Sequence, residues 1–181
     1  MLVIPGLMAI MRGVRRHYDR VGREIASHAP LPTEHLVPPV VLVPFESWNR
    51  LTQKALRFAL LLSPDVIGFH VDAEGEPGLA PREWSKLVEE PARQAGLPVP
   101  QLKVVKSPYR YVIAPIYEYA LELERKYVDR QIAVLLPLLV ERRWYHRFLH
   151  NQRSELLTAL LLFKGNQRIV VMDVPWYLRA E

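Results

Sequence analysis

The sequence of 181 residues contains no cysteine. This absence excludes disulfide scaffolding, thiolate catalysis and zinc sites with cysteine ligands, and it is typical of a reducing compartment. Glycine is scarce as well, because none of the eight glycines lies between Gly96 and Gly165. Nucleotide-binding α/β domains usually carry a glycine-rich loop whose backbone N–H groups hold phosphate. An anion bound to this stretch would therefore be held by side chains.

Signatures of catalysis are missing too. His146 and His150 have the spacing of two metal ligands on a helix, but the HExxH signature requires a glutamate where this sequence has Arg147. Asp72 and Asp173 end apolar runs, where carboxylates most often form turns or caps. No GxSxG elbow surrounds any of Ser27, Ser47, Ser63, Ser85, Ser107 or Ser154. We predict that the protein is not an enzyme and has no metal site.

The charge balance is a weak signal for nucleic-acid binding. The net charge is +5, and the basic residues cluster at 12–23 and at 142–153. A nucleic-acid surface needs basic and aromatic side chains on one continuous face, whereas these clusters lie far apart in the chain. Half of the residues are hydrophobic, which is enough for one well-buried domain and an appendage. We expect no nucleic-acid partner.

Residues 1–26 combine an apolar start with a basic continuation. The uncharged run Met1–Met11 is followed by Arg12, Arg15, Arg16 and Arg20. This run is too short to cross a membrane, which takes about 20 helical residues. The pattern is typical of the end of a membrane helix with cytoplasmic arginines, or of an amphipathic helix on an anionic membrane surface. The third alternative is a helix that docks on its own domain or on a second copy, and we expect a homodimer.

Residues 27–39 contain four prolines and predict an extended linker. The remainder, 40–181, alternates between strand and helix patterns. Apolar or alternating runs predict strands at 40–44, 66–72, 101–106, 132–140 and 168–174. Helical spacing predicts helices at 49–62, capped by Ser47 or Asn49, at 81–95, and up to about residue 127, where Pro115 marks either a kink or the helix start. A basic, leucine-rich helix follows the fourth strand.

This alternation predicts an α/β domain with a doubly wound, five-stranded parallel sheet and helices on both faces. Its motifs are VVLVPFES, VIGFHVD, SPYR, VLLPLLVERRWYHRFLHNQ and IVVMDVPWYL. Together they resemble the carboxy-terminal cytoplasmic domain of bacterial amino acid permease-type transporters of the amino acid-polyamine-organocation superfamily, including its potassium-importing relatives. In this resemblance, the apolar start and RRHYDRVGREI correspond to the end of the last membrane helix and the stalk beneath it.

The cytoplasmic domain of that family is itself similar to the universal stress protein fold. This similarity implies the strand order 3-2-1-4-5 and, in nucleotide-binding members, ATP near the ends of strands one and four. Such members have an aspartate at the end of strand one, where this chain has Pro44-Phe45-Glu46, and glycines after strand four, where it has Glu141-Arg142-Arg143. The resemblance therefore carries over the fold and not the ATP motif.

Four basic residues near the ends of the third and fourth expected strands form our candidate ligand site. They are Arg110, Arg142, Arg143 and His146. Arginine forks suit phosphates and carboxylates. A cyclic dinucleotide is the leading candidate, because the resemblance implies control by such a messenger in some relatives. An adenine nucleotide is the alternative, and we expect no other cofactor.

The same segment also has an interpretation without a ligand. Its arginines would then pair with Glu118, Glu141 or Glu155 on a solvated basic helix face. The core stripe beneath that face would consist of Trp144, Phe148, Leu149 and Leu156.

The sequence thus predicts a regulatory or assembly domain on the cytoplasmic side of the cell membrane, with the membrane domain of a transporter as its partner. Amino acids and potassium both remain open as the transported solute. The alternative is a free-standing nucleotide-binding protein of the universal stress protein type, although the phosphate loop that such a protein needs is absent.

Overall fold

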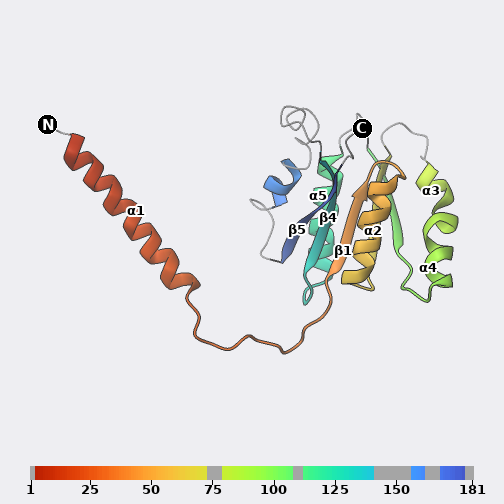
Figure 1. Ribbon diagram of the computed structural model, residues 1–181, viewed down its shortest axis with the longest axis horizontal. Coiled ribbons are helices and arrows are strands. Elements are labelled where there is room, and N and C mark those ends of the chain that lie inside the picture. The colour runs from red at the N-terminus through yellow and green to blue at the C-terminus, as the bar shows by residue number, and fades with distance from the viewer. Residues whose placement is uncertain (1–2, 73–78, 108–111, 141–155, 162–167, 178–181) are drawn as a thin grey trace. The chain divides into compact units, whose positions relative to one another are not determined.

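The computed structural model describes residues 3–72, 79–107, 112–140, 156–161 and 168–177. The chain divides into two compact units, Met1–Leu36 and Val37–Glu181. The first unit contains helix α1, Val3–Ile25 (Figure 1). Although α1 has 23 residues, its arginines interrupt the apolar sequence. No helix in the described part of the chain is both long enough and apolar enough to cross a membrane.

The second unit is built on a five-stranded sheet in which every neighbouring pair of strands is parallel. The strands are β1 (Val40–Phe45), β2 (Val66–Asp72), β3 (Gln101–Lys106), β4 (Ile132–Val140) and β5 (Ile169–Tyr177). Their order is β3-β2-β1-β4-β5. The predicted parallel sheet is confirmed, and so is the strand order that the resemblance implied.

The edge strands agree with their sequence patterns, with one correction. β3 alternates between exposed and half-buried residues and lies at an edge of the sheet, as predicted. The predicted end of the last strand at residue 174 is wrong, because β5 continues to Tyr177 and pairs Pro175 with Leu138. Proline lacks a backbone N–H but is tolerated in an edge strand, where one side has no ladder to complete.

Helices cover both faces of the sheet (Figure 1). Helix α2 (Arg50–Leu62) covers one face and α5 (Ile113–Lys126) covers the other. Pro115 lies in the first turn of α5, so the helix starts there instead of kinking, since proline is tolerated at a helix start. The predicted helix 81–95 consists of α3 (Leu79–Trp84), a π-helical turn (Ser85–Glu89) and α4 (Glu90–Gln94). It ends at Gly96, whose φ of 67° favours glycine.

The sheet separates two apolar cores. On one face Val41 and Val43 pack with α2 and with Trp84 and Val88. On the other face, Val40 and Leu42 pack with α5 and with Leu157 and Leu161 from the helical residues 156–161. The predicted core position of Leu156 is wrong, because this side chain is 52% exposed. The helix presents the neighbouring pair 157 and 161 to the sheet, one turn apart. Trp144, Phe148 and Leu149 lie outside the described residues.

At the amino-terminal ends of the strands, Arg130 holds three segments together. Its Nε donates to the carbonyl oxygen of Pro38 at 2.9 Å, and Nη2 donates to that of Pro39 at 3.3 Å. Its Nη1 forms an ion pair with Asp65 at 2.7 Å. Arg130 precedes β4, the prolines precede β1 and Asp65 precedes β2. One side chain therefore fixes where the linker enters the domain.

Arg168 has a similar role at the start of β5. Its Nη1 donates to the carbonyl oxygen of Tyr127 at 2.9 Å and its Nη2 donates to that of Glu124 at 3.1 Å. These carbonyls belong to the end of α5, where the last helical oxygens have no partner within the helix. The carboxylate of Glu124 is buried and lies 3.8 Å from Arg168, and its Oε1 lacks a hydrogen-bond partner in the described part of the chain. Arg168 thus caps α5 and partly compensates a buried charge.

Gly68, in the middle of β2, allows an aromatic ring to lie on the sheet. Trp84 stacks on Phe45 with 5.8 Å between centroids and 5° between planes, and its Nε1 donates to the carbonyl oxygen of Pro100 at 3.3 Å. A Cβ on Gly68 would lie 2.5 Å from Cη2 of Trp84. Since the indole is held on two sides, it cannot move away without loss of contacts.

We predict that Gly68→Ala lowers the free energy of unfolding by about 1–3 kcal/mol, the usual cost of overpacking. Urea denaturation of the whole chain measures it. In a Trp84→Phe background the clashing atom is absent, so the same substitution should cost less there. An equal cost in both backgrounds would show that the indole is not the obstacle.

Candidate functional site

The candidate site lies at the carboxyl ends of β1 and β4, where the strand order of the sheet reverses. β1 is followed by α2 on one face, and β4 is followed by the helical residues 156–161, which pack on the other. The chain thus leaves neighbouring strand ends in opposite directions. In open α/β sheets, ligands bind in the crevice at this switch point.

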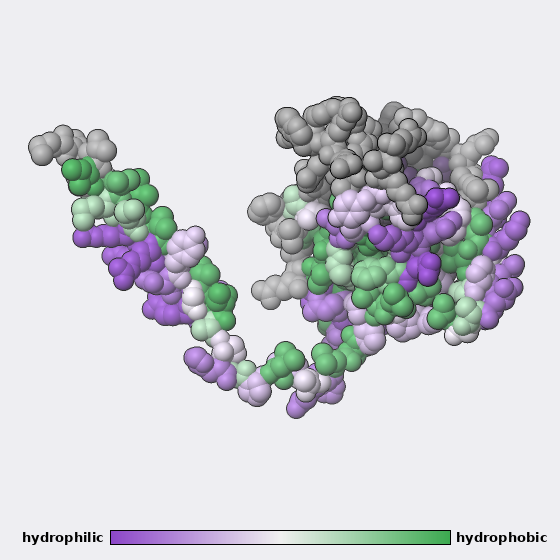
Figure 2. Space-filling view, viewed as in Figure 1, coloured by the Kyte–Doolittle hydropathy of each residue, from purple (hydrophilic) through white to green (hydrophobic). Residues whose placement is uncertain are grey.

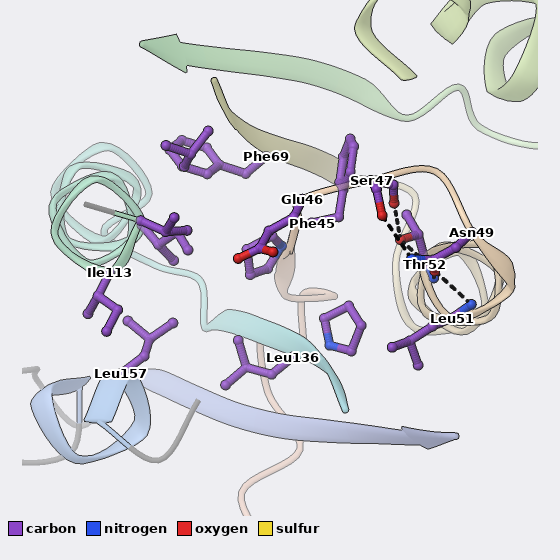
Figure 3. Close-up of a pocket in the computed structure, with 15 residues that line it drawn as sticks. Phe45, Glu46, Ser47, Asn49, Leu51, Thr52, Phe69, Ile113, Leu136 and Leu157 are labelled. Carbon is purple, nitrogen blue, oxygen red and sulfur yellow. Dashed lines mark hydrogen bonds between the residues drawn. The ribbon is translucent and has the colours of Figure 1, made fainter. Parts of the chain in front are cut away.

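A cavity of about 250 Å³ opens at this position (Figure 3). Its walls are mainly apolar side chains from both layers and from the sheet. The lining residues are Pro44, Phe45, Glu46, Ser47, Asn49, Leu51, Thr52, Phe69, Val71, Val112, Ile113, Ile116, Leu136, Pro137 and Leu157. The cavity is therefore lined by residues of six elements, which are β1, β2, β4, α2, α5 and the helical residues 156–161.

The polar rim of the cavity is engaged in capping α2. Oδ1 of Asn49 accepts from the backbone N–H groups of Leu51 at 3.0 Å and Thr52 at 2.9 Å. The hydroxyl of Thr52 donates to the carbonyl oxygen of Ser47 at 2.8 Å. Of the two predicted caps, Ser47 and Asn49, Asn49 is the one that caps the helix. As a consequence, the N–H groups that could hold a phosphate at this helix start already have a partner.

Two lining residues, Phe45 and Phe69, are supported by aromatic neighbours behind the cavity wall. Nδ1 of the buried His70 lies 3.2 Å from the carbonyl oxygen of Phe45, which requires the proton on Nδ1, and the two rings lie 5.3 Å apart. Phe69 stacks on Tyr119 of α5 with 4.9 Å between centroids. Burial raises the pKa of Tyr119, and the nearby Glu122 raises it further, so the phenol stays protonated. The rings of Phe45 and Phe69 in the cavity wall are thus held in place by neighbours behind them.

This geometry suits an uncharged ring or an aliphatic group better than a phosphate. The carboxyl group in the lining belongs to Glu46, and no lysine, arginine or histidine lines the described cavity. Any cation for an anionic ligand must therefore come from outside this wall. Within the described ranges, no group of three His, Asp or Glu side chains is placed to hold a metal ion.

The four predicted ligand-binding residues, Arg110, Arg142, Arg143 and His146, lie outside the described residues. β3 and β4 end at Lys106 and Val140. Because the strands are parallel, these carboxyl ends lie on the side of the sheet where the cavity opens. The segments that carry the four residues continue from that side. The cavity itself was missed by the sequence analysis, because its lining is ordinary core sequence from six elements.

The predicted membrane-proximal residues Arg12, Arg15, Arg16 and Arg20 are all exposed on α1. Arg23 ends the predicted basic cluster 12–23 but was not among the four membrane-proximal residues; it follows Arg12 and Arg16 at helical spacing and lies on the same face. The signal that could have found it is that spacing.

The sheet order and the cavity at its switch point define a doubly wound α/β domain of the universal stress protein-like class. Comparison with known families is more specific. Residues 34–176 match the family described as the KimA potassium transporter C-terminal domain, and the chain belongs to this family. The potassium transporter KimA of Bacillus subtilis (strain 168) is 26% identical in an alignment of 181 positions that covers 99% of this chain and 28% of that protein.

These findings confirm the coarser prediction that the chain belongs to a family of transporter C-terminal domains. The related protein is a potassium transporter, so the amino acid alternative of the resemblance receives no support. The chain spans 28% of the length of this relative.

We predict that Asn49→Ala destabilises the domain by about 0.5–2 kcal/mol, because two backbone N–H groups of α2 lose their acceptor. Asn49→Asp keeps an acceptor oxygen at the same place and should cost much less. Urea denaturation of the two variants and the parent gives the comparison. Equal losses for Ala and Asp would show that the cap oxygen does not stabilise α2.

Proposed function

We propose that this chain is the cytoplasmic regulatory domain of a potassium transporter, without catalytic activity of its own. The membrane domain of the transporter is its partner, and the domain works as a homodimer. The observation that carries the proposal is a preformed cavity at the switch point of a sheet whose sequence belongs to a transporter-domain family. A free-standing nucleotide binder is disfavoured, because 99% of the chain aligns with part of a transporter.

We further propose an anionic nucleotide, and first a cyclic dinucleotide, as the regulatory ligand. The cavity offers apolar walls for a base, and the segments with Arg110, Arg142, Arg143 and His146 follow strands that end at the same edge. Arginine forks there would take the phosphates that the capped start of α2 does not bind. A second copy of the chain would supply a matching set for a ligand with two phosphates.

Calorimetric titration of the whole chain with cyclic di-AMP, ATP and AMP tests this proposal. We expect cyclic di-AMP to bind most tightly and Arg143→Ala to weaken it at least about tenfold, since hydrogen bonds to charged groups are worth about 1.5–3 kcal/mol. Arg125→Ala is the matched control, because it removes the same charge from the exposed end of α5, at the opposite edge. No heat from any of the three nucleotides would leave a purely structural domain.

The proposal also places α1 beside an anionic membrane surface. We expect the chain to bind vesicles that contain anionic lipid at low salt, with about 1 kcal/mol from each arginine near the surface. Replacement of Arg12, Arg16 and Arg20 by Gln should abolish this binding. Replacement of Arg50, Arg57 and Arg125, which are exposed on the α/β unit, removes the same charge and should have little effect. Equal losses for the two triple variants would contradict the placement of α1.

A further inference from the structure

Besides Val3, Met8, Ala9 and Ile10 in its first half, α1 contains seven apolar residues with a spacing of alternating three and four residues. From the first to the last they are Ile4, Leu7, Met11, Val14, Tyr18, Val21 and Ile25. This period of 3.5 is that of a heptad repeat, with Ile4, Met11, Tyr18 and Ile25 at a positions and the other three at d positions. The repeat continues without a break through three heptads of the 23-residue helix.

No described residue of the first unit, 3–36, covers this stripe. The exposed fractions of its side chains include 57% for Leu7, 66% for Met11, 70% for Tyr18 and 76% for Ile25. Figure 2 shows the apolar residues of α1 as a green band along the helix, with hydrophilic residues in purple beside it. A continuous apolar stripe of this length on a helix indicates a partner.

The charged residues fit a paired helix. Arg12, Arg16, Arg20 and Arg23 occupy b, f, c and f positions, on the side away from the stripe. Pairing two stripes therefore does not bring these arginines together. Arg15 lies at an e position, which in a parallel pair faces the g position of the partner, and that position is Ile10.

The width of the stripe distinguishes a helix partner from a lipid surface. A helix on a surface usually presents an apolar face at least about 100° wide. In the second half of α1 the flanking e and g positions are Arg15, His17, Gly22 and Glu24, so the apolar stripe narrows to a and d alone. This narrow seam matches the groove of a second heptad helix.

We propose that α1 pairs with α1 of a second copy of this chain as a parallel, two-stranded coiled coil through Ile4, Leu7, Met11, Val14, Tyr18, Val21 and Ile25. The inference names the seam of the homodimer and therefore rests on the proposed function. The paired helices leave their basic b, c and f positions outside, where they are free to meet anionic lipid headgroups.

The absence of cysteine makes the seam testable by single-cysteine cross-linking of the whole chain. Val21→Cys places a thiol at a d position, and Asp19→Cys places one at a b position two residues away. Disulfides need Cα atoms within about 7 Å, which a parallel seam provides at Val21 and not at Asp19. We expect Val21→Cys to form the covalent dimer at least about tenfold faster than Asp19→Cys under mild oxidation. Equal rates would overturn the seam.

A second cross-linking experiment tests whether the two α1 helices are parallel. In an antiparallel pair, Val21 would lie near Ile4 of the other helix. Cross-linking that required a mixture of Ile4→Cys and Val21→Cys chains would overturn the parallel arrangement.

Light scattering separates failure of the seam from failure of the homodimer. We expect the parent chain to be a dimer at tens of micromolar, Val14→Asp to be a monomer, and Arg16→Asp, at an outer f position, to remain a dimer. A Val14→Asp chain that remains dimeric places the interface in the α/β unit and overturns the seam alone. A monomeric parent chain overturns both the homodimer and the seam.

Discussion

The central strand β1 has no exposed side chain, and the arrangement of the α/β unit follows from that burial. Its six residues alternate between the two apolar cores, with Val40 and Leu42 on the α5 face and Val41, Val43 and Phe45 on the α2 face. A strand that is apolar on both faces must be covered on both. The composition of β1 thus accounts for the helical layers on both faces of the sheet. The strand order β3-β2-β1-β4-β5 then places the switch point, and the cavity, between β1 and β4.

The two ends of the parallel strands have different roles. Where the strands begin, the guanidinium groups of Arg130 and Arg168 each donate to at least two backbone carbonyls of neighbouring segments. Such charge-assisted bonds are among the stronger ones, and they fix the linker and the end of α5. At the carboxyl ends, the described hydrogen bonds of the β1–α2 loop stay within the loop and the first turn of α2. Two arginines join the segments where the strands begin, whereas the segments at the carboxyl ends, although linked by the bonds of His70 to Phe45 and of Lys54 to Pro175, enclose the cavity.

The sequence predicted the elements that have strong local patterns. Continuous apolar runs located β2 and β4 at their observed bounds, and alternation placed β3 at an edge. The strand order came from the resemblance, since periodicity carries no information on which strands are neighbours. The analysis of the sequence missed the π-helical turn at Ser85–Glu89 and the burial of Leu157 in place of Leu156. Both depend on which side of a helix faces the sheet. The cavity was missed for the same reason, since it is a property of six elements packed together.

The lack of glycine after β4 and the cap on α2 have the same chemical consequence. A phosphate site of the usual kind needs free backbone N–H groups at a helix start and glycines that let the ligand approach. Here Asn49 occupies two of those N–H groups, and no glycine lies between Gly96 and Gly165. Glu46 adds a carboxyl group to the cavity lining, which disfavours an anion further. The fold thus keeps the position of a nucleotide site without its phosphate cradle, and affinity for an anion must come from side chains beyond the described wall or from a second copy of the chain.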